Sequence, residues 1–190
     1  MPAKKSKYNK NKGIIRGIEF DKGTTAIYEK GILSVNGKKG HAEKKLLSKN
    51  IKIEVKGNKV VIESKRSTKK DKTIVMTFEA HIKNLLRGVG EGYRYALKIC
   101  SGHFPMNVSV NNDDFTIKNF LGEKIPRKMK IKNGAAVKVE GDQVIVESLN
   151  KEIAGQVSAD IENLTRRPGY DPRIFQDGVF IISKPGKETR

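Results

Sequence analysis

The second half of this chain repeats the first, and the duplication constrains the fold more than any other feature of the sequence. Residues 55–64 read VKGNKVVIES and residues 139–148 read VEGDQVIVES, with five of the ten positions identical. In each copy β-branched residues flank a Gly-Asn or Gly-Asp dipeptide, and tight turns favour these dipeptides. Each stretch is therefore predicted to form a β-hairpin.

A predicted helix follows each hairpin. Apolar residues spaced by 4, 4 and 3 positions occupy one face of a helix, and both copies have this spacing, at Ile74, Phe78, Ile82 and Leu85 and at Ile153, Val157, Ile161 and Leu164. Position 55 aligns with 139 in the hairpins and position 74 with 153 in the helices, so the first copy contains five additional residues between them. These fall within residues 64–72, a basic stretch that is predicted to be a loop.

Shorter stretches alternate between apolar and polar residues, which is typical of strands. We predict strands at residues 93–99, 104–110, 115–118, 129–132 and 179–182. The fold class is therefore α+β, with two tandem similar domains, each a small, mostly antiparallel sheet packed with one helix. The predicted boundaries are a basic N-terminal extension at 1–17 that is disordered alone, a first domain at 18–101 and a second domain at 102–190.

Charge is the second strong constraint. The chain has 39 Lys and Arg and 21 Asp and Glu, a formal net charge of +18, which exceeds what solubility requires and indicates a polyanionic partner. Residues 1–17 carry six basic residues and no acidic residue, residues 18–101 carry 19 and 9, and residues 102–190 carry 14 and 12. A solvated basic surface without a partner is the alternative that charge alone leaves open.

Cysteine, histidine and hydropathy patterns argue against several classes of protein. The single cysteine, Cys100, cannot form an intramolecular disulfide, and His41, His81 and His103 lack the spacing of a zinc site. No stretch reaches the ~18 apolar residues needed to cross a bilayer, and the N-terminus lacks the apolar segment of a signal peptide. We expect a soluble intracellular protein with no cofactor, no metal, no small-molecule substrate and no membrane partner.

Three motifs have a structural interpretation. Residues 88–92 (GVGEG) are similar to a nucleotide-binding glycine loop, but they follow a predicted helix and precede a strand, the reverse of the order that phosphate binding requires. Gly88 is therefore predicted to cap the helix C-terminus. Asp113 and Asp114 lie in a predicted turn, and His81 is expected to be half-buried beside the apolar face of the first helix. No catalytic residue is predicted.

Basic residues in predicted loops are the candidate nucleic-acid contacts, because Lys and Arg neutralise phosphates and Arg also stacks on bases. The first-domain set comprises Lys38, Lys39, Lys65, Arg66, Lys69 and Lys70. The second-domain set comprises Lys124, Arg127, Lys128, Arg166, Arg167 and Arg173. Tyr170 adds an aromatic ring to the loop that carries Arg166 and Arg167.

Three stretches resemble the universal family of large-subunit ribosomal proteins that is numbered six in bacteria and nine in eukaryotes. Residues 119–124 (NFLGEK) are similar to the hairpin of the family's second domain in its archaeal and eukaryotic form. Residues 87–89 and 92–95 are similar to the segment that joins the first helix to the last strand of its domain. Residues 173–180 (RIFQDGVF) resemble the C-terminal signature, with Phe180 where tyrosine is usual. The resemblance extends over about residues 18–184.

The resemblance implies a structural protein of the large ribosomal subunit rather than an enzyme. It implies direct binding of ribosomal RNA near the sarcin-ricin loop and the stalk base, where neighbouring ribosomal proteins lie and translation factors dock. It also implies a cytoplasmic location, after nucleolar assembly if the source is a eukaryote. Residues 37–40 (GKKG) lack the proline that is usual after the first glycine, which predicts a less rigid turn.

Other classes of function remain as alternatives. A nucleic-acid-modifying enzyme, or a basic RNA-binding protein outside the ribosome, would share the basic surfaces, but an enzyme also needs an acid, histidine or metal constellation that the sequence does not offer. A protein that docks on anionic membranes should have a basic amphipathic helix. The predicted helix at 74–86 has few basic residues and the one at 152–164 carries acids.

Overall fold

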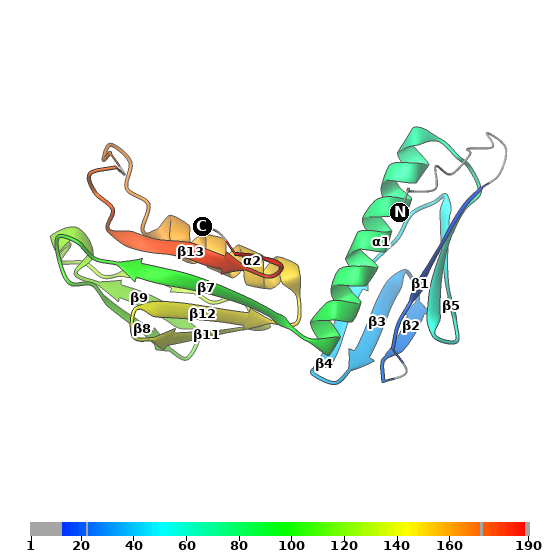
Figure 1. Ribbon diagram of the computed structural model, residues 1–190, viewed down its shortest axis with the longest axis horizontal. Helices are drawn as coiled ribbons and strands as arrows, with labels where there is room; N and C mark the ends of the chain where they lie inside the picture. Colours follow the sequence, from blue (N-terminus) through cyan, green and yellow to red (C-terminus); the bar gives the residue numbers. More distant parts are fainter. Residues whose placement is uncertain (1–12, 22, 172, 189–190) are drawn as a thin grey trace, which may run out of the picture. The chain divides into compact units, whose positions relative to one another are not determined.

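The duplication is present in the computed structural model as two units, the first ending at Gly90 and the second beginning at Glu91 (Figure 1). The structure describes residues 13–21, 23–171 and 173–188. Each unit contains one long helix and two antiparallel sheets. The α+β class and the two similar domains are thereby confirmed, although each domain was expected to have a single sheet.

The first unit consists of two three-stranded sheets and the helix α1. The sheet orders are β1-β6-β5 and β2-β3-β4, and every pairing is antiparallel. The elements are β1 (Ile14–Glu19), β2 (Thr25–Glu29), β3 (Ile32–Gly37), β4 (Gly40–Lys45), β5 (Ile51–Lys56), β6 (Lys59–Ser64) and α1 (Lys69–Gly90).

The second unit has the same plan with additional strands at its C-terminal end. Its sheet orders are β10-β9-β8 and β11-β12-β7-β13-β14. The elements are β7 (Tyr93–Cys100), β8 (Asn107–Asn111), β9 (Asp114–Lys118), the 3-10 helix η1 (Phe120–Gly122), β10 (Arg127–Lys130), β11 (Ala135–Glu140), β12 (Gln143–Ser148), α2 (Lys151–Leu164), β13 (Gly178–Lys184) and β14 (Lys187–Glu188).

The strands of the two units correspond in chain order, so that β1 matches β7 and the hairpin β5-β6 matches β11-β12. In the first unit β1 pairs with β6, and the Phe20 N–H donates to the Asn58 carbonyl at 3.0 Å just beyond that pairing. In the second unit β7 pairs with β12, and the Ile99 N–H donates to the Asp142 carbonyl at 2.8 Å. Residue 20 therefore corresponds to residue 99, the same offset that relates the two helices.

The boundary between the units differs from the predicted one at residues 101 and 102. The strand at residues 93–100 was expected to close the first domain, but it is β7, which pairs with β12 on one side and with β13 on the other. Local alternation predicts a strand without indicating which sheet it joins. Residues 14–17 of the predicted extension likewise belong to β1, and residues 1–12 lie outside the described residues.

Turn and cap residues explain where the main elements begin and end. Gly57 and Gly141 occupy the hairpin turns at φ of 56° and 57°, which confirms both hairpins and uses a conformation that glycine adopts without a Cβ clash. The helix α1 begins at Lys69 and continues to Gly90, so the predicted loop at 64–72 is shorter than expected. Gly88 is buried inside this helix, which shows that its predicted role as a cap was wrong.

Each unit has its own hydrophobic core, formed by the inner faces of its sheets and one face of its helix. The fully buried residues of the first core include Leu33, Val35, Val60, Ile62, Val75 and Ile82. Those of the second include Leu97, Phe115, Ile117, Val144, Val157 and Ile161. Phe104 and Met106 were predicted to share a strand face with Val108, but β8 begins only at Asn107, so they lie in the preceding loop.

Candidate nucleic-acid interface

The first-domain set of basic residues divides into two groups at opposite ends of α1. Lys38 and Lys39 form the exposed turn between β3 and β4. The Lys39 N–H donates to the Val89 carbonyl at 3.0 Å, which places this turn at the C-terminal end of the helix. Gly37 permits the approach, because a Cβ on this residue would lie 2.5 Å from Cγ1 of Val89.

The other four residues lie at the N-terminal end of the same helix. Lys65 and Arg66 are in the connection from β6, whereas Lys69 and Lys70 form the first turn of α1. A helix of 22 residues is about 33 Å long at 1.5 Å per residue. The structure therefore does not bring the first-domain set together at one site.

The N-terminal group is held by a reciprocal helix cap. The Asp71 N–H donates to Oγ1 of Thr68 at 3.2 Å, and the Thr68 hydroxyl donates to Oδ2 of Asp71 at 2.6 Å. Asn50 also donates to this carboxylate, at 3.2 Å. The hydrogen bond from Thr68, followed by the one from Asn50, lowers the pKa of Asp71 below its ordinary value. The N-terminal end of a helix carries partial positive charge, so Lys69 and Lys70 are unfavourable there and the carboxylate of Asp71 offsets them.

Three connections of the second unit come together, although they are far apart in sequence. They are residues 101–106 after β7, residues 119–126 around η1, and residues 165–171 and 173–177 after α2. The amide Nδ2 of Asn119 donates to the Pro105 carbonyl at 3.1 Å, which joins the first two. The rings of His103 and Phe175 stack with centroids 5.2 Å apart, which joins the first and the third. We call these three segments the loop cluster.

Arg127 ties the second connection to the third. Its Nε and Nη2 donate to the two carboxylate oxygens of Glu123 at 2.8 and 2.6 Å, and Nη1 donates to the Leu164 carbonyl at 2.6 Å. The guanidinium carbon lies 4.3 Å from the centroid of the Phe120 ring. The hydrogen bonds from Arg127 hold the pKa of Glu123 below its ordinary value, despite partial burial of the carboxyl group. Arg127 was predicted to contact nucleic acid, but its guanidinium is engaged in these internal contacts.

Asp177 ties the first connection to the third. Its side chain is 1% exposed, and Oδ1 accepts from the N–H groups of Gly102 at 2.7 Å and His103 at 3.0 Å. The Oδ2 atom contacts Nδ1 of His103. Burial disfavours the charged form, but the hydrogen bonds from His103 and Gly102 outweigh it, so the pKa of Asp177 lies below its ordinary value.

Two predicted arginines line an open cavity that the loop cluster forms together with residues of α2 and β13. Its volume is about 510 Å³, and its walls include Phe120, Leu121, Arg166, Arg167, Tyr170 and Phe175. The guanidinium carbon of Arg167 lies 4.1 Å from the centroid of the Tyr170 ring, and Tyr170 meets Phe175 edge to face at 4.9 Å between centroids. Arginine stacked on an aromatic ring beside an open cavity can contact both a phosphate and a base.

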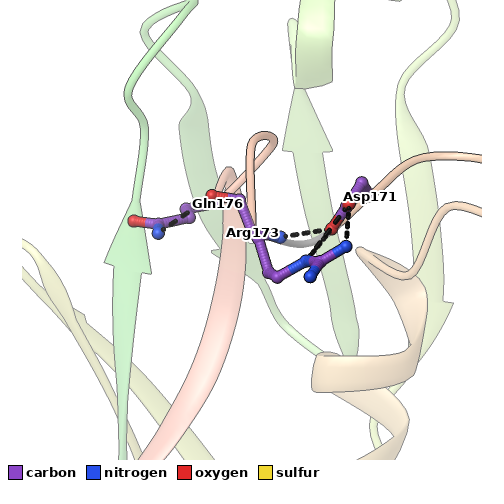
Figure 2. Close-up of polar contacts among 3 residues, drawn as sticks. All are labelled: Asp171, Arg173 and Gln176. Atoms are coloured by element: carbon purple, nitrogen blue, oxygen red, sulfur yellow. Dashed lines mark hydrogen bonds and ion pairs between the residues drawn. The ribbon is translucent and has the colours of Figure 1, made fainter.

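Arg173 lies in the same connection as Arg166 and Arg167, and its side chain is exposed to solvent. Figure 2 shows the Arg173 side chain against Asp171. Its Nη2 donates to Oδ2 of Asp171 at 2.8 Å, and its Nε donates to Oδ1 at 3.1 Å. The Gln176 amide donates to the backbone carbonyl of Arg173 at 3.4 Å. The Arg173 side chain is 89% exposed. An ion pair this exposed contributes little stability, so the guanidinium can exchange Asp171 for a phosphate at small cost.

Lys124 and Lys128 complete the second-domain set, and both are exposed. Lys124 lies in the connection between η1 and β10, and Lys128 lies in β10. The structure thus places Lys124, Arg166, Arg167 and Arg173 in or between the segments of the loop cluster. Arg127, one residue before Lys128, supports the cluster from inside.

Three residues of the loop cluster were missed from the sequence as parts of a site. His103 and Phe175 stack on each other, and Phe104 is 48% exposed. An exposed aromatic residue in a loop next to basic residues was the available signal. Phe104 was instead assigned to a strand because it continues the alternation of Met106, Val108 and Val110.

The described part of the chain contains no cluster of three or more His, Cys, Asp or Glu residues that could hold a metal ion. None of its helices has the length and apolar composition needed to cross a membrane. Asn112 adopts φ of 53° in the turn from β8 to β9, which also contains Asp113 as predicted, whereas Asp114 is already the first residue of β9. His81 is half-buried on α1, as predicted.

The sequence is similar to known ribosomal proteins. A family model described as Ribosomal protein L6 matches residues 104–178. The large ribosomal subunit protein uL6 of Methanosarcina mazei is 42% identical over 173 residues, which cover 91% of this chain and 98% of the relative. The protein of the same name from Methanobrevibacter smithii is 42% identical over 88% of this chain and 94% of the relative, and that from Methanococcus vannielii is 45% identical over 76% and 80%.

Proposed function

Because this chain belongs to the uL6 family of large ribosomal subunit proteins, we propose that it binds ribosomal RNA through the loop cluster of its second unit. The family is a structural, non-enzymatic component of the ribosome, and the chain is a ribosomal protein of this kind rather than an enzyme. The proposed binding site comprises Arg166, Arg167 and Arg173, with Lys124 and Lys128 beside them.

The convergence of three connections is the observation that carries this proposal. Arg166 and Arg167 lie on the wall of a cavity that also contains the rings of Tyr170 and Phe175. Single-stranded or bulged RNA is recognised by such combinations, because guanidinium groups neutralise phosphates while aromatic rings accept unstacked bases. Arg127 and Asp177 hold the cluster in shape, so the basic side chains are positioned before RNA arrives.

In the same proposal the first unit contributes two separate contacts. Lys38 and Lys39 neutralise phosphates at the C-terminal end of α1, and Lys65, Arg66, Lys69 and Lys70 do so at its N-terminal end. Contacts about 33 Å apart hold two points of a folded RNA rather than one groove. This arrangement suits assembly and scaffolding, in which no bond is made or broken.

The place of binding follows from the family resemblance and is part of the proposal. The RNA near the sarcin-ricin loop and the base of the stalk is the expected target. Neighbouring ribosomal proteins near the stalk base flank the chain there, and translation factors dock nearby. The chain acts in the cytoplasm as part of the large subunit, after assembly in the nucleolus if its source is a eukaryote.

Charge reversal of the arginine pair tests the site. The double variant Arg166→Glu and Arg167→Glu should lower the occupancy of the chain in purified large subunits, measured by quantitative mass spectrometry across a sucrose gradient. In a binding assay with the free RNA, the log–log dependence of affinity on salt should become less steep by roughly 1 to 2, since about one counterion is released per phosphate contact.

A matched control carries the same change in charge outside the loop cluster. Lys98 in β7 and Lys138 in β11 are both exposed, and their double substitution by Glu alters the net charge equally. This control should retain higher occupancy than the arginine variant. Equal loss in both variants would show that total charge matters and the loop cluster does not, and wild-type occupancy of the arginine variant would exclude the pair as a contact.

A further inference from the structure

The two units differ at one edge of their equivalent sheets. In the second unit β7 is flanked on both sides, by β12 and by β13. In the first unit β1 pairs with β6 on one side, and no described strand pairs with its other side. β1 is thus an edge strand among the described strands, whereas its counterpart β7 lies between β12 and β13 (Figure 1).

The backbone groups at the outer edge of β1 can be assigned from its register. The Phe20 N–H points toward the β5-β6 hairpin, because it donates to the Asn58 carbonyl. Backbone groups alternate in direction along an antiparallel strand. The N–H and C=O groups of Ile15, Gly17 and Glu19 therefore point away from β6, and no backbone hydrogen bond to another described residue satisfies them.

The second unit shows what occupies the equivalent edge. There β13 pairs with β7 in antiparallel register from Gly178 to Ser183. Its own outer edge is satisfied by side chains of α2 and the residue after it, since the Val179 N–H donates to Oγ1 of Thr165 at 3.1 Å and the Ile181 N–H donates to Oε1 of Glu162 at 3.1 Å. The occupant is thus a short extended segment that pairs with β7 on one side, while its other side meets β14 and the side chains of Glu162 and Thr165.

Burial differs between the units at corresponding positions of the strand and of the helix. Tyr95 is 7% exposed and Val157 is fully buried in the second unit. Their counterparts in the first unit are Arg16, whose side chain is 51% exposed, and the half-buried Phe78. Met76, on the same helix, is 51% exposed. The first unit therefore leaves open the backbone edge that β13 occupies in the second.

We propose that the outer edge of β1 binds an extended segment of another protein of the large subunit, which adds to the sheet as an antiparallel strand. The inference rests on the proposed function, because it takes the partner from the same subunit. The groups that would be recognised are the peptide groups of Ile15, Gly17 and Glu19. Addition of a strand to an exposed edge derives affinity from main-chain hydrogen bonds and specificity from alternate side chains.

The chemistry of the edge favours a protein partner over RNA. The three residues whose backbone groups point outward include the apolar Ile15, the side-chain-free Gly17 and the acidic Glu19, which is already paired with Lys59 at 2.6 Å. Such an edge offers alternating peptide donors and acceptors rather than an array of cations. The partner segment should carry β-branched or aliphatic residues at alternate positions, as Val179 and Ile181 do in β13.

Photo-crosslinking in assembled subunits tests the proposal. The full chain carries a benzophenone amino acid in place of Ile15, whose side chain is 66% exposed, and large subunits that contain it are purified and irradiated. We expect a cross-link to a short extended segment of one other ribosomal protein. A cross-link only to RNA, to a second copy of the chain or to residues 1–12 of the same chain would overturn the proposal, as would the absence of any cross-link.

Two substitutions of one residue provide the matched control. Gly17→Pro removes the outward N–H that the added strand requires, and proline is tolerated in an edge strand where that N–H faces solvent. Gly17→Ala keeps the N–H, and its Cβ has no neighbour within 4 Å. The proline variant should lower the cross-link yield about tenfold, consistent with loss of one hydrogen bond and its neighbours, whereas the alanine variant should match the parent. Equal yields in both variants contradict strand addition.

Hydrogen exchange keeps the proposal testable if the proline variant folds poorly. The amides of Ile15, Gly17 and Glu19 in the unsubstituted chain should exchange at least about tenfold more slowly in the large subunit than in the free chain. Unchanged exchange in the subunit would overturn the proposal. Absence of the chain from large subunits would instead refute the proposed function, and the sucrose gradient detects that outcome separately.

Discussion

The two units share one scaffold but differ in the connections that leave it. The first unit joins β3 to β4 through a two-residue turn, whereas the second joins β9 to β10 through residues 119–126. The second unit also adds residues 165–177 after its helix, and these pack against the other long connections. The unit with long connections has a cavity lined by arginines and aromatic rings. Duplicated folds thus diverge in their loops, where substitutions and insertions leave the core unchanged.

Arg127→Ala gives the largest expected effect, because its hydrogen bonds join two segments of the loop cluster that are far apart in sequence. The substitution removes hydrogen bonds to Glu123 and to the Leu164 carbonyl, and hydrogen bonds to charged groups contribute about 1.5–3 kcal/mol. We expect the free energy of unfolding of the second unit to fall by about 2–3 kcal/mol, measured by hydrogen exchange resolved by unit. Lys128→Ala, at an exposed neighbour, should change it by less than about 0.5 kcal/mol. Similar losses in both variants would contradict the structural role of Arg127.

Asp177→Asn should destabilise the loop cluster by about 1–2 kcal/mol at neutral pH, because a charged acceptor of two backbone N–H groups becomes neutral. The pKa of Asp177 is lower in the folded chain than its ordinary value. Its contribution is therefore complete above the unfolded pKa of about 4 and is lost as the pH falls through the lower folded pKa.

The stability difference between this variant and the parent should accordingly shrink as the pH is lowered below about 4. Thermal unfolding over a series of acidic buffers measures it. Asp142→Asn, in an exposed hairpin turn, provides the control and should show little difference at any pH. A difference for Asp177→Asn that stays constant down to low pH would mean that its charge contributes nothing.

Gly37→Ala should lower the free energy of unfolding of the first unit only. A Cβ at this position would lie 2.5 Å from Cγ1 of Val89, so the turn that carries Lys38 and Lys39 must move away from α1. Overpacking of this kind costs about 1–3 kcal/mol, and we expect about 1.5 kcal/mol. Gly17→Ala, which meets no neighbouring atom, should be close to neutral. Hydrogen exchange of the Lys39 amide reports the change directly, and unchanged protection there would contradict the close approach.

The helix caps give the smallest expected effects and test how similar the two units are. Thr68→Ala removes a hydroxyl that accepts from the Asp71 N–H and donates to its carboxylate. Asn150→Ala removes a single acceptor of the Glu152 N–H, at 2.9 Å. Loss of such a cap costs about 1 kcal/mol, and the Thr68 variant should lose more because Asp71 also loses a hydrogen bond. Equal losses, compared by urea unfolding, would mean that the reciprocal bond adds nothing.

Much of the fold was predictable because its signals are local. The hairpins at Gly57 and Gly141 depend on turn dipeptides between β-branched residues, and both helices on apolar spacing that matches the helical repeat. Arg166 and Arg167 were predicted to lie in a loop because they precede Pro168 and Gly169, and the structure places them in the connection after α2. Their contact with RNA stays a prediction. Each of these features is encoded within about a dozen neighbouring residues.

The loop cluster was predicted only in part, because the contacts that form it are not local. Arg127 and Lys128 are adjacent basic residues in the sequence, yet the side chain of Arg127 is half-buried and that of Lys128 is exposed. Arg127 differs because it donates a hydrogen bond to the carbonyl of Leu164, which lies 37 positions later in the chain. The first-domain basic set likewise looked like one site, since nothing in its sequence indicates that α1 separates its members.

The sequence by itself determined the duplication, the type of most elements, the excess of positive charge and the resemblance to a ribosomal family. The tertiary structure alone decided that β7 belongs to the second unit, that Asp177 and Arg127 join three loops into one surface, and that β1 keeps an open edge. The physical reason is that turn and helix preferences act between neighbours in the chain. Strand partners and loop contacts depend on residues brought together only by folding, up to 87 positions apart for the strand partners Ala96 and Ser183.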